Sequence, residues 1–294
     1  MKVEAECLPC LFERGYREAT HLTKDERLRI EALRKLLGML AEEFKPEAYP
    51  AKLGTLRDRI IREFFGGRDP YINVKKKSNR LALRLLSEAE DFVSSAKTPY
   101  ERFRKACLVA ATANALEFDV KGYKFRLEDF RLSLGSQIFT IDHTKQAYRL
   151  VRNGGPVFYL ADNAGEIVLD RVLVGVLKEF GAEVFLIVKG RPVLNDATLK
   201  DAEASGIDKM VDEVETIGDT VGFIWDEASP RLRSRLVEAK LTIAKGMGNY
   251  EAITELEGRN LGIKVFFLLK AKCSPVARSL KVERGALVSL LKTL

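Results

Sequence analysis

Histidine is almost absent from this chain of 294 residues, which contains only His21 and His143. Because histidine is the commonest protein ligand for zinc and related metals, a histidine-rich metal site is disfavoured. Four cysteines are too few for a disulfide framework in a chain of this length. Glutamine is also scarce, with two residues beside 31% charged side chains, a bias that indicates a thermophilic source.

Long hydrophobic runs and glycine-rich nucleotide motifs are missing as well. No apolar run approaches the roughly 20 residues of a membrane span, and the first ten residues lack an apolar signal core. We therefore expect a soluble cytoplasmic protein that does not engage a membrane. No Gly-x-Gly-x-x-Gly, Walker loop or Gly-x-Ser-x-Gly elbow is present, which argues against dinucleotide binding, P-loop chemistry and serine hydrolysis.

The net charge of +7 comes entirely from the first half of the chain. Residues 151–294 hold 20 basic and 20 acidic side chains, whereas residues 1–150 hold 29 basic and 22 acidic ones. A basic half can attract nucleic acid. However, Lys75-Lys76-Lys77 is the only tight basic run, and the other charges interleave with acids. We therefore expect a solvated helical surface and not a nucleic-acid interface.

The hydrophobic periodicity changes near residue 150. Before it, a Thr-x-x-Glu capping box at residues 23–26 precedes one amphipathic helix. Further helices are predicted at about 53–64, 81–93, 98–116, 127–134 and 143–152. After it, helical stretches alternate with apolar runs at 157–160, 184–188, 241–244 and 265–269 and a weaker run at 210–214. This alternation predicts an α/β protein, with a helical cap domain over 1–150 and a three-layer α/β/α, Rossmann-like domain with a mainly parallel sheet over 151–294.

Polar side chains follow two of the predicted strands. Asp162 and Asn163 come directly after the run at 157–160, and Asp196 lies beyond the run at 184–188. Ligands bind at the carboxyl ends of parallel strands, and neighbouring strands lie about 4.8 Å apart, so the three side chains could reach one ion. Two carboxylates and an amide suit Mg²⁺ or Mn²⁺. Each side chain could instead simply cap the helix that follows it, and both interpretations remain open.

The later strand ends carry glycines and lysines. The run at 241–244 leads into Lys245-Gly-Met-Gly, where Gly246 and Gly248 would let backbone amides approach a ligand closely. The run at 265–269 is followed by Lys270 and Lys272, and a lysine at this edge can neutralise a transferring phosphoryl group.

Cys7 and Cys10 form a Cys-x-x-Cys at the start of the first predicted helix. Such a pair can bind a metal, act as a redox couple or serve the structure. No second Cys-x-x-Cys completes a zinc site, and Cys273 is the only other cysteine beside polar chemistry. Our hypothesis is a structural or regulatory role that ties the first helix to the α/β part.

These stretches together resemble the DUF89 family of metal-dependent damage-control phosphatases, in order over nearly the whole chain. The Cys-x-x-Cys is similar to that of the mainly prokaryotic branch. Other branches carry Arg-Thr-x-Lys near the last strand, where this chain has Leu-Lys-Ala-Lys at 269–272, so only Lys272 matches fully. The matching stretches are Cys7-x-x-Cys10, Asp69-Pro70-Tyr71, Asn114 with Glu117, Asp162-Asn163-Ala164-Gly165-Glu166, Asn195-Asp196, the Lys-Gly-Met-Gly-Asn-Tyr-Glu at 245–251 and the Lys-Ala-Lys-Cys-Ser-Pro at 270–275.

The resemblance implies hydrolysis of small phosphate esters, such as sugar phosphates or damaged phosphometabolites. It also implies a divalent metal held by Asp162, Asn163 and Asp196, with Mg²⁺ and Mn²⁺ as first candidates and Ni²⁺ and Co²⁺ as further ones. Asp162, Lys272 and Glu166 are the catalytic candidates, and the nucleophile is either metal-bound water or a carboxylate such as Asp162. The predicted substrate-binding residues are Asn79, Asn114, Glu117, Lys189, Asn195, Lys245, Gly246, Gly248, Asn249, Glu251 and Lys270. The alternatives are a Rossmann-like methyltransferase, for which the first loop has too few glycines, and a non-enzymatic binding module.

Overall fold

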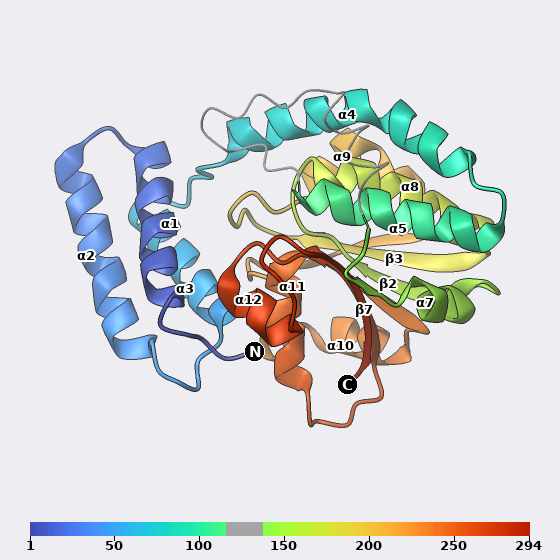
Figure 1. Ribbon diagram of the computed structural model, residues 1–294. Helices are drawn as coiled ribbons and strands as arrows, with labels where there is room; N and C mark the ends of the chain where they lie inside the picture. Colours follow the sequence, from blue (N-terminus) through green and yellow to red (C-terminus); the bar gives the residue numbers. More distant parts are fainter. Residues whose placement is uncertain (116–137) are drawn as a thin grey trace.

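The first part of the chain folds into helices, as the sequence predicts. The structure, a computed structural model, describes residues 1–115 and 138–294. Three helices form a bundle at one end of the molecule, and two more lie over the sheet (Figure 1). They are α1 (Cys7–Leu22), α2 (Glu26–Glu43), α3 (Pro50–Phe64), α4 (Ile72–Ser94) and α5 (Pro99–Ala115). The helix predicted at 127–134 lies outside the described residues.

The start of α2 differs from the predicted capping box. Asp25, not Thr23, is the N-cap, and its carboxylate accepts hydrogen bonds from the backbone amides of Arg27 at 2.9 Å and Leu28 at 3.4 Å. The Thr23 hydroxyl oxygen instead accepts one from the Asp25 amide at 3.1 Å. Because aspartate caps a helix at least as well as threonine, the capping pattern found the helix but placed its N-cap two residues early.

The five helices contribute to two separate apolar cores. Leu11 of α1, Leu36 and Leu40 of α2 and Leu53 of α3 share one buried cluster, so α1–α3 form a bundle of their own. Helices α4 and α5 contribute instead to the apolar core on one face of the sheet. The division of the chain at residue 150 stays a prediction.

The second part of the chain forms one mixed, mostly parallel sheet, which confirms the predicted α/β class. In the described residues the strand order is β1-β7-β6-β5-β2-β3-β4. The β6–β7 pair is antiparallel, and the other pairs are parallel. The strands are β1 (Ile141–Asp142), β2 (Gly155–Leu160), β3 (Ala182–Lys189), β4 (Glu213–Ile217), β5 (Leu241–Lys245), β6 (Lys264–Lys270) and β7 (Leu287–Thr293).

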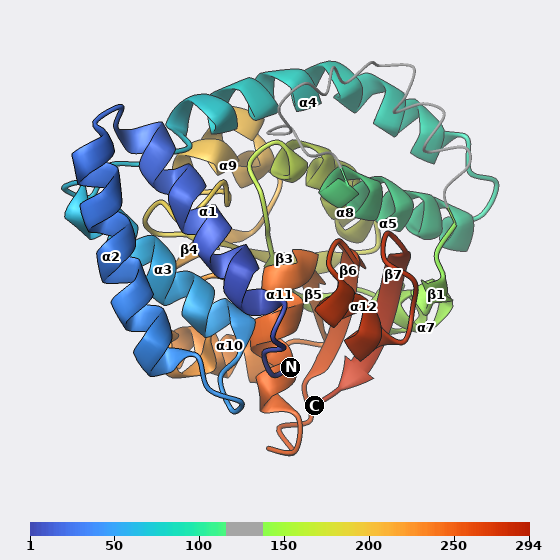
Figure 2. The ribbon, with the colours of Figure 1, turned by 60° about the vertical axis from the view of Figure 1, so that its left-hand side comes forward.

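Alternating side chains attach a helical layer to each face of the sheet (Figures 1 and 2). Val157 and Tyr159 of β2 pack in the core that α4, α5, α7 and α8 share, whereas Phe158 and Leu160 pack with α10, α11 and α12. These later helices are α7 (Thr144–Val151), α8 (Glu166–Glu179), α9 (Leu199–Ser205), α10 (Pro230–Glu238), α11 (Gly246–Ile253) and α12 (Ser274–Leu280). Among the described residues, no helix is both long and apolar enough to cross a membrane.

The four strong apolar runs lie in β2, β3, β5 and β6, as predicted. The weaker run at 210–214 is wrong in position, because β4 begins only at Glu213 and Met210 follows a short 3₁₀ turn. Strands β1 and β7 were not predicted. Strand β1 has only two residues, and β7 includes Ser289, Lys292 and Thr293, so neither shows a continuous apolar run.

Candidate active site

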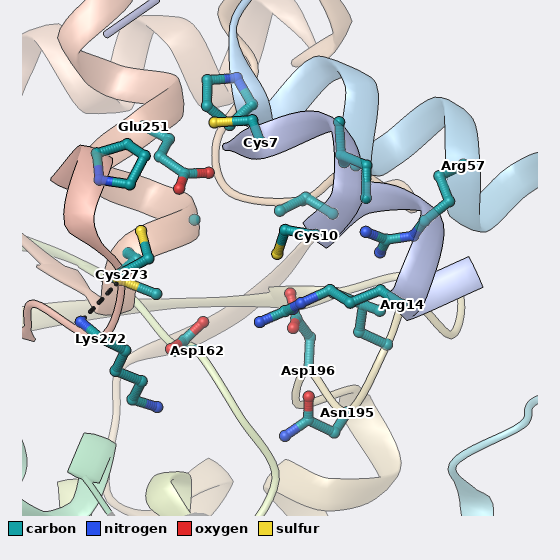
Figure 3. Close-up of a pocket in the computed structure, with 18 of the residues that line it drawn as sticks. Cys7, Cys10, Arg14, Arg57, Asp162, Asn195, Asp196, Glu251, Lys272 and Cys273 are labelled. Atoms are coloured by element: carbon teal, nitrogen blue, oxygen red, sulfur yellow. Dashed lines mark hydrogen bonds between the residues drawn. The ribbon is translucent and has the colours of Figure 1, made fainter. Parts of the chain in front are cut away.

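A cavity of about 440 Å³ opens where the α1–α3 bundle faces the carboxyl ends of the central strands. Figure 3 shows acidic, basic and thiol side chains from both parts of the chain directed into it. Eight of the residues predicted to form a site line this cavity: Asn114, Asp162, Asn163, Asn195, Asp196, Gly248, Glu251 and Lys272. The structure therefore brings together residues that are more than 150 positions apart in the sequence.

The loops after β2 and β3 are joined through their backbones. Asn163 and Asp196 form an isolated antiparallel bridge. The Ala164 amide donates to the Asn195 carbonyl at 2.9 Å, and the Ala197 amide donates to the Asp162 carbonyl at 2.8 Å. These bonds hold the three predicted metal ligands next to one another. The spacing of neighbouring strands had predicted this proximity.

The helix-capping interpretation of these three side chains does not hold. Helix α8 begins after Gly165, which has φ +84° and supplies no side-chain cap. Helix α9 is capped by Thr198 in a capping box with Asp201. The predicted ligands are therefore left for other interactions.

The Asp162 carboxylate is held on one side only. Its Oδ2 accepts hydrogen bonds from the side-chain amides of Asn114 at 2.8 Å and Asn163 at 2.9 Å. Glu166 accepts from the same two amides, at 3.0 and 2.6 Å. Gly246, with φ +76°, lies so close that a Cβ there would be 1.8 Å from Asp162 Oδ2. Only glycine fits at that position without displacing the carboxylate.

Each predicted ligand has an oxygen without a hydrogen bond inside the described part of the chain. These are Oδ1 of Asp162, Oδ1 of Asn163 and both carboxylate oxygens of Asp196, of which Oδ2 lies 3.6 Å from Lys189. Burial, followed by the charges of Glu166 and Asp196, raises the pKa of Asp162 well above its ordinary value. Burial likewise raises the pKa of Asp196 to about 6, although Lys189 opposes the shift. Two carboxylates that repel each other and a free amide oxygen form a donor set for a hard divalent cation, which would offset the repulsion.

This donor set fits a divalent metal through oxygen atoms alone. The described residues contain no preformed group of three or more histidine, cysteine or carboxylate side chains that could hold a metal ion. The three predicted ligands include only two carboxylates, and the third is the amide of Asn163. An Mg²⁺ or Mn²⁺ ion commonly completes such a set with water and phosphate oxygens.

Lys245 lies inside the protein, behind the cavity wall. Its ammonium is fully buried, 2.7 Å from Asp170 and 3.4 Å from Glu166. Burial disfavours that charge, but Asp170 and Glu166 outweigh it and raise the pKa of Lys245. Asp170 escaped the sequence analysis, although an acid one turn after Glu166 in an apolar helix signals a buried partner.

Other predicted residues support the site from behind. Asn79 accepts from the Gly165 amide at 2.6 Å and so anchors the loop after β2. Lys189 lies 3.6 Å from Asp196. Asn249 donates to the Ala161 carbonyl at 3.2 Å. None of these three side chains lines the cavity.

The remaining predicted residues have mixed placements. Gly246 and Gly248 were expected in a loop, but they lie in the first turn of α11. Lys270 donates its backbone amide to Asn114 Oδ1 at 3.2 Å, while its side chain does not line the cavity. Glu117 lies outside the described residues.

Helix α1 supplies cavity residues that the sequence analysis missed. Arg14 lines the cavity from the same helical face as Cys7 and Cys10, and this i, i+3, i+7 spacing was the available signal. The four cysteines are free. Burial raises the pKa of Cys273 to about 11 and that of Glu251 to about 7. The Cys273 thiol is thus protonated near neutral pH.

Comparison with known proteins identifies the family. The family model described as the damage-control phosphatase ARMT1-like domain matches residues 3–288. This chain belongs to that family. It is 36% identical over 293 residues to a damage-control phosphatase of Archaeoglobus fulgidus, covering 98% of this chain and 99% of the relative. It is 32% identical to a damage-control phosphatase of Pyrococcus horikoshii, with 99% and 98% covered.

The solved structures agree with this assignment. The crystal structure of a DUF89 family protein from Pyrococcus horikoshii superimposes with a TM-score of 0.87 at 32% identity, covering 99% of both chains. The predicted membership in the damage-control phosphatases is confirmed. Family membership implies a phosphatase, and thus a hydrolase that acts on phosphorylated substrates.

Proposed function

We propose that this damage-control phosphatase family member is a metal-dependent phosphomonoesterase that hydrolyses small phosphate esters, such as sugar phosphates or damaged phosphometabolites. One observation carries the proposal: Asp162, Asn163 and Asp196 converge in the same cavity as the Lys272 side chain. Oxygen donors for a cation therefore lie beside a cation that can hold a phosphoryl oxygen.

The three converging side chains would hold the metal through their free oxygens. When bound, a divalent cation supplies Lewis acidity that withdraws negative charge from the phosphoryl group. Asn114 and Glu166 act as positioning residues, because they hold the Asp162 carboxylate and the Asn163 amide in their observed orientations.

The phosphoryl group would lie between Lys272 and the start of α11. Met247 and Gly248, in the first turn of that helix, line the cavity. The positive end of a helix favours an anion, and its first backbone amides have no partner within the helix. Lys272 makes no ion pair with any described residue, so its ammonium is available to a phosphate oxygen.

The test compares Asp162→Ala and Asp196→Ala with Asp212→Ala, an exposed acid that pairs with Lys178. Turnover of p-nitrophenyl phosphate and of a sugar-phosphate panel is measured across Mg²⁺, Mn²⁺, Ni²⁺ and Co²⁺, and Mn²⁺ affinity is measured by calorimetry. We expect the first two variants to lose at least about 10²-fold in rate and to bind Mn²⁺ more weakly, with the fold intact. Near-normal turnover by either variant at saturating metal would show that the metal assignment is wrong.

A further inference from the structure

Arg14 is a cation in the cavity that forms no ion pair with a described residue, although the Glu251 carboxylate in the same cavity lies near enough to interact with its charge. Its side chain extends from α1 into the cavity that Asp162 and Asp196 also line (Figure 3). No ion pair or hydrogen bond joins its guanidinium to any residue in the described ranges 1–115 and 138–294. A guanidinium placed in this way is available to a ligand.

The other arginines of the cavity wall are already engaged. Arg57 lies 3.0 Å from Glu18, both side chains being buried. Arg17 pairs with Glu13 at 2.5 Å. The remaining one, Arg284, donates to the Lys272 carbonyl at 2.9 Å.

Among the described cavity residues, Arg14 and Lys272 are thus the two cations whose charged groups make neither an ion pair nor a hydrogen bond, and they come from different walls. Arg14 lies on α1, whereas Lys272 follows β6. If Lys272 holds the phosphoryl group, Arg14 is free to bind a different part of the same substrate.

Close helix packing fixes the backbone of α1 at Arg14, whose side chain is exposed. A Cβ on the neighbouring Gly15 would be 2.3 Å from Leu36 Cδ2, so α1 sits directly against α2. The planar guanidinium of an arginine matches the two oxygens of a carboxylate or phosphate.

We propose that Arg14 binds a second anionic group of the substrate, so that the cavity selects phosphate esters that also carry a carboxylate or a second phosphate. The inference rests on the proposed function, which places the phosphoryl group at Lys272 and α11. It concerns the far end of the substrate, away from the bond that breaks.

The test uses substrate pairs that differ only in the second group. They are 3-phosphoglycerate against glycerol 3-phosphate, 6-phosphogluconate against sorbitol 6-phosphate, and fructose 1,6-bisphosphate against fructose 1-phosphate. The first two pairs report a carboxylate at two chain lengths, and the third reports a second phosphate. The wild-type protein is compared with Arg14→Ala, Arg14→Lys and the matched control Arg17→Ala.

We expect the wild type to prefer the doubly anionic member of at least one pair through a lower KM. A charge-assisted contact made equally in ground and transition states changes KM and leaves kcat alone. Arg14→Ala should reduce the preference by about 10- to 100-fold, the range for hydrogen bonds to charged groups. Arg14→Lys should retain part of it, and Arg17→Ala should keep it within about twofold.

Two outcomes would overturn the inference. One is a wild type with no preference in any pair. The other is an equal fall in kcat on both members of each pair in Arg14→Ala, which would place Arg14 at the phosphoryl group. Calorimetric titration of the same compounds in EDTA measures binding without turnover, so it separates failure of this inference from failure of the proposed function. An Arg14-dependent binding preference without any turnover would refute the phosphatase proposal and support the anion site.

Discussion

Replacement of Gly246 by alanine tests the site more sharply than removal of a carboxylate does. The new methyl group would lie 1.8 Å from Asp162 Oδ2, well inside van der Waals contact. The carboxylate is the movable partner, because the Gly246 backbone starts α11. We therefore expect Gly246→Ala to displace the Asp162 carboxylate and to leave the rest of the fold in place.

Gly258 provides the matched control for this change. It has φ +85° against +76° for Gly246, and a Cβ there would meet no atom within 4 Å. Each alanine pays the left-handed backbone cost of about 1–2 kcal/mol, which lowers Tm by roughly 2–8 °C. Only Gly246→Ala also moves a group of the proposed site, and a displacement of about 1 Å can cost about 10²-fold in rate.

The assay measures Tm by calorimetry and kcat/KM on p-nitrophenyl phosphate for both variants at saturating Mg²⁺ or Mn²⁺. We expect Tm to fall in both variants, and further in Gly246→Ala because the displaced carboxylate gives up its hydrogen bonds to Asn114 and Asn163; kcat/KM should be about 10²-fold lower in Gly246→Ala alone. If the two variants were equally active, the observed position of the Asp162 carboxylate would not matter for turnover. The catalytic role proposed for Asp162 would then fail.

Two further changes test other parts of the site. Lys272→Ala should lower kcat about 10²–10³-fold, while Lys270→Ala should change it little because its side chain does not line the cavity; equal small effects in steady-state kinetics would remove lysine from the mechanism. Lys245→Met should lower the free energy of unfolding by about 3–5 kcal/mol, because it leaves Asp170 buried and unpaired. Denaturant unfolding should show that the double variant with Asp170→Leu recovers much of the lost free energy of unfolding. If it recovers none, the broken Lys245–Asp170 ion pair is not the cause of the loss.

The sequence predicts best those strands that are buried on both faces. Strands β2, β3, β5 and β6 lie in the middle of the sheet, where both faces are covered and the sequence becomes a continuous apolar run. Strand β4 lies at an edge, and its Glu213 and Glu215 pair with Arg231 and Arg235. Such polar alternation does not stand out in the sequence, so β4 was displaced, whereas β7 was missed because Ser289, Lys292 and Thr293 interrupt its apolar residues.

The candidate site was predictable only as far as strand ends could place it. Asp162 and Asp196 each follow a strand that the sequence predicts, so their position at the carboxyl edge of the sheet could be predicted too. Lys245 was misplaced because alternation puts it on the face of β5 that carries Ile243, and nothing in the sequence says that α8 covers that face. Arg14 was missed because the approach of α1 to the sheet depends on tertiary packing alone.

The charges around the site favour a divalent cation. Two buried lysines, Lys245 and Lys189, contact acids of the cluster. With these lysines counted, the cluster keeps a formal charge of about −2, which a divalent cation would neutralise. The four carboxylates in the cluster are Asp162, Glu166, Asp170 and Asp196.

Metal should therefore stabilise the folded protein, and by an amount that depends on pH. At 100 times its Kd, a ligand that binds only the folded state adds about 2.7 kcal/mol, so we expect Mn²⁺ to raise Tm by about 5–10 °C at pH 8. The pKa of Asp196 is about 6, and metal must displace protons from its ligands. Because the pKa of Asp162 is raised as well, the gain in Tm should be largest at pH 8, shrink as pH falls, and be lost as pH falls through about 6. Scanning calorimetry with Mn²⁺ and with EDTA between pH 5 and 8 measures it, with Asp196→Ala as the variant that should show no gain. A gain that is independent of pH, or one that survives in Asp196→Ala, would place the metal elsewhere.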